Sequence, residues 1–391
     1  MNKHILLQDV QDFINDHLKS DLHKLILKGT PFNDISIQEI ANQISCKKKS
    51  EKKLPSWYQN NAIYYPSKIN IEQTSSEKTA SYKSALVSGK SLIDLTGGFG
   101  VDSYYFSKVF DKVTYCEIDK KLSSITAHNF EQLQVRNVQV ISENGIEYLM
   151  KSKDVFDVIY IDPSRRTSNQ RKVFLLEDCQ PNITENIDLL FSKTRSILLK
   201  TSPILDMTNA INGLKFVKEI HIVSINNEVK ELLFLLEKEH RGDVQIKTIN
   251  FTKESSQKFD FIYNQQSSST YHEPQTYLYE PNAAILKSGG FHEISDQLKI
   301  FKLHQHSHLY TSEKLMDFPG RKFKIIQINP YDKKKITSLI PLKKANISTR
   351  NFRKTVFQIR KDLKIKDGGD HFLFFTTNIH HKPICIHCVK I

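Results

Sequence analysis

The sequence has few of the residues that mark specialised protein classes. Of 391 residues, only 5 are Cys, 12 are Pro, 13 are Gly and 1 is Trp. The scarcity of Gly and Pro, together with 39% hydrophobic residues, excludes collagen-like structure and wholesale disorder. Five scattered cysteines do not form a disulfide framework and fit a reducing compartment. The composition therefore predicts one large or several modest globular domains.

Long hydrophobic runs are also absent. The longest uncharged apolar runs, such as residues 232–236, fall far short of the roughly 20 residues that cross a bilayer. The amino terminus carries acidic residues and lacks the apolar segment of a signal peptide. We therefore expect no membrane span and a cytoplasmic location.

Positive charge is concentrated at the carboxyl end. The chain has 56 Lys and Arg against 43 Asp and Glu, a formal net charge of +13. Residues 321–391 contain 17 basic and 4 acidic residues and carry the whole excess, whereas residues 1–320 are neutral. Such a basic segment favours a polyanion partner, because Lys and Arg release counterions from phosphates. Arg350, Arg353 and Lys354 are candidate contacts, and a phospholipid surface or an acidic protein are alternative partners.

Hydrophobic periodicity indicates how the chain is organised. Apolar residues in residues 1–58 recur at steps of three and four, which predicts an amphipathic helix pair. From residue 91, short apolar runs alternate with helical patterns, as in a doubly wound parallel sheet. Residues 264–275 are polar and resemble a linker. We expect an α/β protein with a Rossmann-like sheet, an N-terminal helical segment and small C-terminal α+β domains.

A glycine-rich turn, DLTGGFG at residues 94–100, directly follows the first expected strand. Glycine at a strand-to-helix turn permits positive φ and lets the backbone approach a ligand, while the next helix offers free N–H groups. The pattern favours a nucleotide or adenosyl ligand over a plain tight turn. No GKS or GKT follows, which disfavours a nucleoside triphosphatase, and the full GxGxxG of dehydrogenases is missing.

Polar residues also follow the next three expected strands. Glu117, 23 residues after Asp94, ends the second strand and is placed to accept ribose hydroxyls. Asn144 follows the third strand, and Asp162 follows the fourth. Because open α/β sheets bind ligands at the carboxyl ends of their strands, these residues predict one shared ligand site.

Four segments carry a resemblance to a known family: residues 70–80, DLTGGFGVD, IDPSRR and residues 344–352. In them the sequence resembles bacterial class I S-adenosylmethionine-dependent methyltransferases with a ferredoxin-like unit and a C-terminal THUMP-like domain. The resemblance implies four parts: an N-terminal helical segment at 1–58, a methyltransferase domain at 59–270, a ferredoxin-like domain at 271–319 and a basic THUMP-like domain at 320–391. It further implies methylation of a base in structured RNA, tRNA or rRNA.

The resemblance also implies roles for individual residues. The cofactor, S-adenosylmethionine, would be held by Asp94, Thr96, Gly97, Gly98, Gly100, Glu117, Asn144 and Asp162. The catalytic residues would be Asp162, Arg165 and Arg166.

Two departures from the family pattern leave alternatives open. Thr96 stands where the family usually has its first glycine, and Ser164 and the two arginines after it replace the Pro-aromatic pair of amine-modifying enzymes. A non-catalytic RNA-binding protein on this scaffold, or a protein methyltransferase, therefore remains possible. We expect no metal site, because Cys385 and Cys388 lie in an apparent strand with no second Cys pair nearby.

Overall fold

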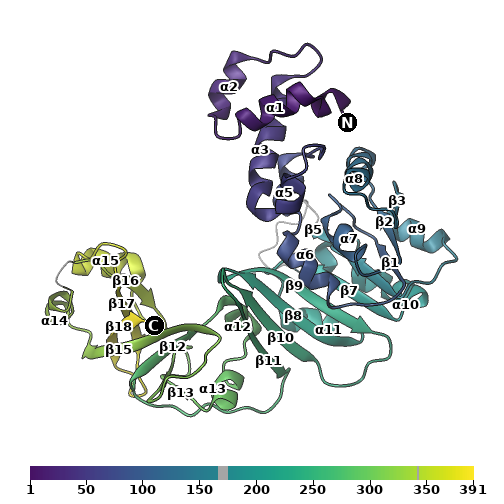
Figure 1. Cartoon of the computed structure of the whole chain (residues 1–391). Coiled ribbons are helices and arrows are strands. Elements are labelled where there is room, and N and C mark those ends of the chain that lie inside the picture. The colour runs from purple at the N-terminus through teal and green to yellow at the C-terminus, as the bar shows by residue number, and fades with distance from the viewer. Residues whose placement is uncertain (166–174, 341–342) are drawn as a thin grey trace. The chain divides into compact units, whose positions relative to one another are not determined.

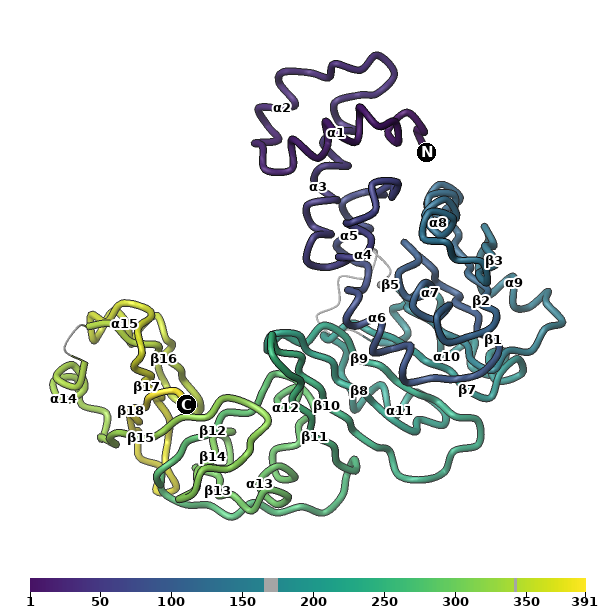
Figure 2. The backbone as a smooth tube through the Cα atoms, viewed as in Figure 1, coloured from purple at the N-terminus to yellow at the C-terminus, as the bar shows by residue number. Residues whose placement is uncertain are grey.

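The computed structural model describes residues 1–165, 175–340 and 343–391. The chain divides into two compact units, which can be followed by colour in Figures 1 and 2. The first contains residues 1–218 and 233–241, and the second contains residues 219–232 and 242–391. Within the described ranges, no helix is long and apolar enough to cross a membrane.

Helices form the beginning of the first unit. Their bounds are η1 Lys3–Leu6, α1 Gln8–Asp16, α2 Leu22–Lys28, α3 Ile37–Lys53, α4 Pro55–Tyr58, α5 Lys68–Gln73 and α6 Glu77–Ser84. Residues 1–58 thus form four α-helices, and the predicted pair is wrong. Asp21 and Ser36 each accept backbone N–H groups and so begin a new helix. Pro55 begins α4, because proline lacks an N–H and suits a first helical position.

A parallel sheet forms the rest of the first unit. Its strands are β1 Ser91–Asp94, β2 Lys112–Cys116, β3 Val138–Ile141, β4 Val158–Ile161 and β7 Ser196–Thr201, and the last residues of β9 Glu228–Glu237 join them. The strand order is β9-β7-β4-β1-β2-β3, and the pairs β7-β4, β4-β1, β1-β2 and β2-β3 are parallel. The intervening helices are α7 Val101–Phe106, α8 Lys120–Gln132, α9 Gly145–Lys151, α10 Ile183–Lys193 and α11 Met207–Gly213. All four residues of β4 are buried, as expected of an inner parallel strand.

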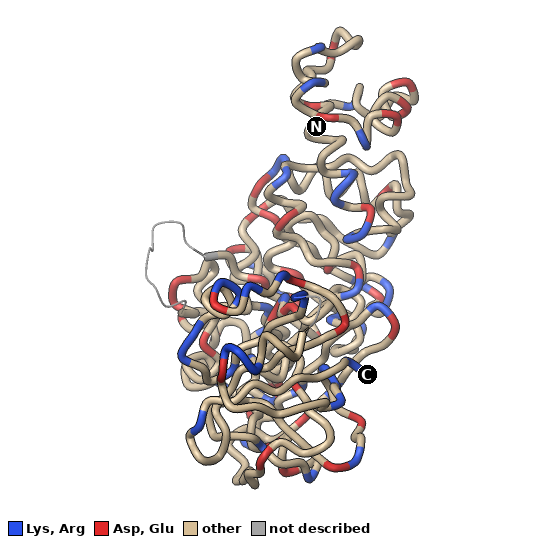
Figure 3. The backbone as a smooth tube through the Cα atoms, turned by 90° about the vertical axis from the view of Figure 1, so that its left-hand side faces the viewer, with Lys and Arg blue, Asp and Glu red and all other residues tan. Residues whose placement is uncertain are grey.

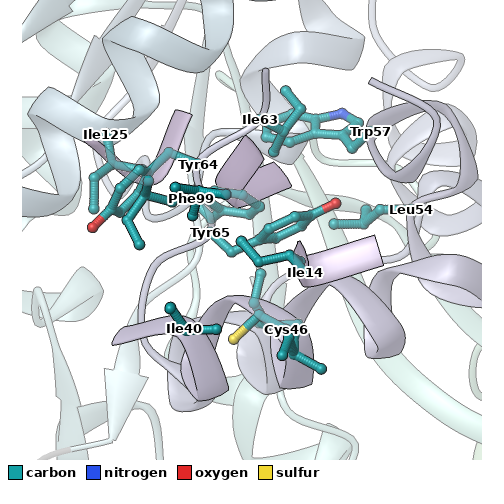
Figure 4. Close-up of a cluster of buried hydrophobic side chains, with 14 of the residues drawn as sticks. Ile14, Ile40, Cys46, Leu54, Trp57, Ile63, Tyr64, Tyr65, Phe99 and Ile125 are labelled. Atoms are coloured by element: carbon teal, nitrogen blue, oxygen red, sulfur yellow. The ribbon is translucent and has the colours of Figure 1, made fainter. Parts of the chain in front are cut away.

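One hydrophobic cluster joins the N-terminal helices to the glycine-rich turn (Figure 4). Trp57 is fully buried, and its ring centroid lies 4.7 Å from that of Phe99, the aromatic residue of the turn. Tyr65 lies 6.4 Å from Phe99 on the same measure. Asn129 on α8 exchanges hydrogen bonds of 2.9 and 3.0 Å with the backbone of Tyr64. The turn therefore rests on packing from the N-terminal segment.

The second unit contains two groups of strands. In the first, β8 Val217–Ile225, β10 Gln245–Phe251 and β11 Ser256–Ile262 lie in the order β11-β10-β8-β9, where β9 contributes its earlier residues. The second is a seven-stranded sheet with the order β13-β14-β12-β15-β18-β17-β16. Its bounds are β12 Tyr277–Pro281, β13 Phe301–Lys302, β14 Tyr310–Ser312, β15 Gly320–Pro330, β16 Asn346–Thr349, β17 His371–Thr377 and β18 Pro383–Lys390. The helices of this unit are α12 Ala283–Ser288, α13 Glu293–Leu298, α14 Lys333–Ser338 and α15 Val356–Leu363.

Strand β15 connects the strands that precede residue 320 with those that follow it. It pairs antiparallel with β12 on one side and with β18 on the other. Glu280 of β12 is 2% exposed, and its carboxylate forms ion pairs with Arg321 and with Arg350, the latter at 2.6 Å. A buried carboxylate requires such partners because desolvation of an unpaired charge is costly. Residues before and after position 320 therefore form one sheet with one buried ion-pair group.

Candidate functional site

The turn between β1 and α7 has the backbone that the glycines predict. Gly98 and Gly100 have φ of +56° and +81°, in the left-handed region that disfavours other residues. A Cβ at Gly97 would lie 2.1 Å from the ring of Tyr115 on β2, so only glycine fits there. The Tyr115 hydroxyl donates to the Gly98 carbonyl at 2.6 Å. The turn is thereby held against β2 by direct hydrogen bonding.

Asp94 lies beneath this turn and is 1% exposed. Its carboxylate accepts hydrogen bonds from the Thr96 N–H at 3.0 Å and from the Ser103 hydroxyl at 2.6 Å. Burial raises the pKa of the Asp94 carboxyl to about 7, although both hydrogen bonds oppose that shift. Asp94 thus ties the start of the turn to helix α7 and does so from the interior of the protein.

Glu117, at the end of β2, faces the same turn. One carboxylate oxygen accepts the Gly98 N–H at 2.8 Å, and the other accepts the Asp119 N–H at 2.8 Å. The next residue, Ile118, is 67% exposed. A partly exposed carboxylate and an exposed apolar side chain therefore stand side by side at this strand end. Ile118 is not among the residues predicted from the sequence, although its place directly after the strand-ending acid Glu117 was the available signal.

Asn144 caps helix α9, because its side-chain oxygen accepts the N–H groups of Ile146 at 2.9 Å and Glu147 at 3.3 Å. The following residue, Gly145, is packed against the backbone of Leu95, where an added Cβ would lie 2.4 Å from the Leu95 carbonyl oxygen. The end of the third strand is therefore in close contact with the residue that begins the glycine-rich turn after β1.

Asp162 completes the group of strand ends. Its backbone N–H donates to the Thr96 hydroxyl oxygen at 2.7 Å, a bond that glycine at position 96 could not form. Its carboxylate forms an ion pair with Lys200 on β7, whose side chain is 12% exposed. Asp162 itself is 31% exposed. Asp162 is thus partly exposed to solvent, and the more deeply buried Lys200 neutralises its carboxylate.

The predicted arginines are only partly described. Arg166 lies outside the described residues. Arg165 lies in the two-residue strand β5 Ser164–Arg165, which pairs antiparallel with β6 Cys179–Gln180. Their predicted catalytic roles stay predictions. The remaining predicted residues come together around one turn, namely Asp94, Thr96, Gly97, Gly98, Gly100, Glu117, Asn144 and Asp162.

A buried ion pair next to the turn has no counterpart in the sequence analysis. Lys83 on α6 is fully buried, and its ammonium lies 3.1 Å from the carboxylate of Asp102 on α7. The same carboxylate accepts the hydroxyls of Ser75 at 2.9 Å and Tyr160 at 2.7 Å. Burial raises the pKa of Asp102, but the charges of Lys83 and Lys200 and the hydrogen bonds from Tyr160 and Ser75 together lower it by more, so the net shift is downward. A sequence signal was weak here, because an isolated lysine usually indicates a solvated surface.

Comparisons with known proteins agree with this architecture. Residues 277–319 match a ferredoxin-like domain model, and residues 320–390 match a THUMP domain-like model. A crystal structure of a putative methyltransferase from Porphyromonas gingivalis W83 has a TM-score of 0.89 and 29% identity, covering 100% of this chain and 99% of that one. An uncharacterized RNA methyltransferase from Mycoplasma mobile is 30% identical over 94 residues, which are 24% of this chain and 25% of that protein.

The fold is therefore that of a methyltransferase-like α/β protein, and the predicted Rossmann-like fold class is confirmed. More specifically, the chain joins this fold to a ferredoxin-like domain and a THUMP domain-like domain, as the resemblance implied. The matched segment spans only a quarter of the Mycoplasma relative.

The raised pKa of Asp94 predicts a pH-dependent stability. Because the folded-state pKa of about 7 exceeds the unfolded value of about 3.9, the folded state binds a proton more tightly, and stability falls as pH rises from about 4 to about 7. Asp94→Asn keeps an acceptor for Thr96 and a polar partner for Ser103 but does not titrate. Between pH 5 and pH 8, we expect the unfolding free energy of this variant to change by a few kcal/mol less than that of the wild type.

Urea unfolding at the two pH values measures this difference. The exposed Asp111→Asn is the matched control and should follow the wild type. Parallel pH dependence of Asp94→Asn and wild type would exclude Asp94 as the titrating group.

The Lys83–Asp102 pair predicts a large stability loss when it is broken. Lys83→Ala leaves the buried Asp102 carboxylate without its ion-pair partner, which costs about 3–5 kcal/mol. Chemical denaturation measures the loss. The exposed Lys90→Ala is the control, with a change within about 0.5 kcal/mol. Equal stability of the two variants would show that the pair does not support the fold.

Proposed function

We propose that this protein is an S-adenosylmethionine-dependent methyltransferase that modifies a base in structured RNA, either tRNA or rRNA. The observation that carries the proposal is the meeting of four strand ends at one turn. Gly98 bonds to Glu117, Thr96 bonds to Asp162, and Gly145 packs on Leu95. Parallel α/β sheets bind their ligands at this edge.

The residues at the turn fit an adenosyl ligand. Among the atoms of the described residues, a Cβ at Gly98 would meet only the Thr96 carbonyl oxygen within 4 Å, at 3.9 Å, so these residues leave that side of the turn uncovered. Glu117 offers a carboxylate to the ribose hydroxyls, and the exposed Ile118 offers an apolar face to the adenine ring. Asn144 lies at the same edge and would stand beside the adenine amine.

The chemistry follows from the cofactor and from Asp162. S-adenosylmethionine supplies an electrophilic methyl group, so the protein mainly has to orient the nucleophile and exclude water, which is worth roughly 7–11 kcal/mol in favourable cases. One Asp162 oxygen is paired with Lys200, and within the described residues the other has no hydrogen bond. The described residues leave that oxygen able to accept a hydrogen bond from an exocyclic amine and to stabilise the positive charge that develops there.

The basic carboxyl end supports an RNA substrate. Six of the 17 basic residues in 321–391 form internal ion pairs: Arg321, Lys322, Lys333, Arg350, Lys354 and Arg360. The other 11 have no ion pair in the described part of the chain, and Figure 3 marks Lys and Arg in blue. Free cations attract phosphates by releasing condensed counterions. The match to a THUMP domain-like model over residues 320–390 is consistent with this assignment.

Glu117→Ala tests the cofactor site. Loss of the carboxylate removes the acceptor for both ribose hydroxyls, and loss of two hydrogen bonds to a charged group should weaken S-adenosylmethionine binding by about 10-fold or more. Isothermal titration calorimetry measures the affinity. Glu131→Ala, an exposed position on α8, is the control and should bind as the wild type does. Unchanged affinity of the Glu117 variant would remove Glu117 from the cofactor site.

Asp162→Asn tests catalysis. We expect transfer of radiolabelled methyl to RNA from gene-deleted cells to fall by about 100-fold or more, because the amide cannot take up the developing positive charge. Asp111→Asn, an exposed aspartate directly before β2, is the matched control.

The same assay separates the rival functions. Labelled RNA with wild type and none with Asp162→Asn supports the proposal. Binding of cofactor and RNA without any transfer would favour a non-catalytic RNA-binding protein, and label in protein but not in RNA would favour a protein methyltransferase.

A further inference from the structure

Helix α15 presents an aromatic side chain to solvent. Phe357 is 77% exposed, although the helix that carries it is well formed, with a capping box between Thr355 and Gln358. Ile359 and Leu363 are buried in the core of the same domain. At 3.6 residues per turn, these two residues face inward and place Phe357 and Lys361 together on the outward face. The exposure of Phe357 is therefore a property of the helix face and not of a frayed end.

The surroundings of Phe357 are positively charged. Arg353, Lys361 and Lys364 are exposed and form no ion pair with any described residue. The two nearby acids are already neutralised, since Asp362 pairs with Lys333 at 3.4 Å and Lys354 at 2.6 Å, and Asp367 pairs with Arg360.

We propose that Phe357, together with Arg353, Lys361 and Lys364, forms a platform that stacks an unpaired RNA base and contacts the phosphates beside it. This inference rests on the proposed RNA substrate and specifies the form of that RNA: a single-stranded nucleotide beside or within the structured part. Bases in a duplex have both faces covered by their neighbours, so an open aromatic face selects an unpaired base.

Charge complementarity favours RNA over a protein partner. An apolar docking patch for a protein needs a contiguous group of exposed apolar side chains. On α15, Phe357 is instead followed by Gln358 and, one turn later, by Lys361. An aromatic ring interleaved with cations matches the alternation of bases and phosphates along a single strand.

Fluorescence anisotropy with three labelled RNAs tests the platform on the full-length protein. The probes are a 12-nucleotide single strand of mixed sequence, the duplex that it forms with its complement, and the same single strand with abasic sites. We expect Phe357→Ala to weaken binding of the single strand about 5- to 100-fold, the range for loss of one stacked base, and to bind the abasic strand as the wild type does.

Three further variants separate stacking from charge and from general hydrophobic contact. Phe357→Tyr keeps the ring and should retain wild-type affinity, whereas Phe357→Leu keeps an apolar side chain without a ring and should behave like alanine. Lys361→Gln should lower the slope of log affinity against log salt by about 0.7, the value for one phosphate contact on a single strand, whereas Phe357→Ala should leave the slope unchanged. Wild-type affinity of Phe357→Ala or Phe357→Leu for the single strand would overturn the stacking platform.

The binding measurements distinguish failure of the stacking platform from failure of the proposed methyltransferase function. If the wild type binds none of the three RNAs, the platform is refuted, whereas the proposed RNA substrate is decided separately by methyl transfer to RNA from gene-deleted cells. If it binds RNA and Phe357→Ala binds equally well, only the platform is refuted. A wild type that binds the single strand tightly but transfers no methyl group would contradict the catalytic proposal, and loss of affinity in Phe357→Ala would still support the platform.

Discussion

Three carboxylates lie close to the turn at residues 94–100, those of Asp94, Asp102 and Asp162, and each is held by its own hydrogen bonds or cation. Burial is the main cause of the raised pKa of Asp94, and the charges of Asp102 and Asp162 raise it further. Each carboxylate is accommodated differently: Asp94 by two hydrogen bonds in the interior, Asp102 by Lys83 from helix α6, and Asp162 by Lys200 from strand β7. The two cations come from different elements, so the ion pairs link helix α6 to helix α7 and strand β7 to the end of strand β4. The least buried of the three carboxylates is that of Asp162, and among the described residues only one of its two oxygens has a partner, Lys200.

This electrostatic arrangement depends on packing from a distant part of the sequence. Helix α6 carries Lys83 and directly follows the N-terminal helices, whose core includes Trp57 and the turn residue Phe99. The turn is thus held from one side by aromatic packing and from the other by hydrogen bonds to strand β2. A ligand that approaches the open side of Gly98 would meet a backbone that is already positioned, which lowers the entropy lost on binding.

How far the sequence could predict this site depends on the range of each interaction. The glycine-rich turn and Glu117 were predictable because strand, turn and helix follow one another locally. The close approach of Gly145 to Leu95 was not predicted, because β2 lies between β1 and β3 in the sheet. The ion pairs of Lys83 and Lys200 join residues 19 and 38 positions apart on separate elements, and no local pattern indicates them. The structure has four helices where a pair was predicted, because single capping residues such as Asp21 and Ser36 determine where a helix begins. Apolar periodicity alone does not indicate these capping residues. The sharing of strand β15 between two domains was likewise invisible, since pairing partners along a sheet are set by tertiary contacts.

Net charge also gives an incomplete account of the C-terminal surface. Arg321 and Arg350, counted from the sequence as part of the basic excess, are held by the buried Glu280 and join strands of the shared sheet. Their first role is structural, because removal of either would leave part of a buried carboxylate uncompensated. The charge that remains for a polyanion is carried by residues without internal partners, several of them on or beside helix α15. Net charge determines the long-range attraction of a polyanion to this surface. The contacts themselves depend on where these unpaired cations and the aromatic ring of Phe357 lie. Specificity on this surface therefore has to come from the face of helix α15 and not from the total charge of +13.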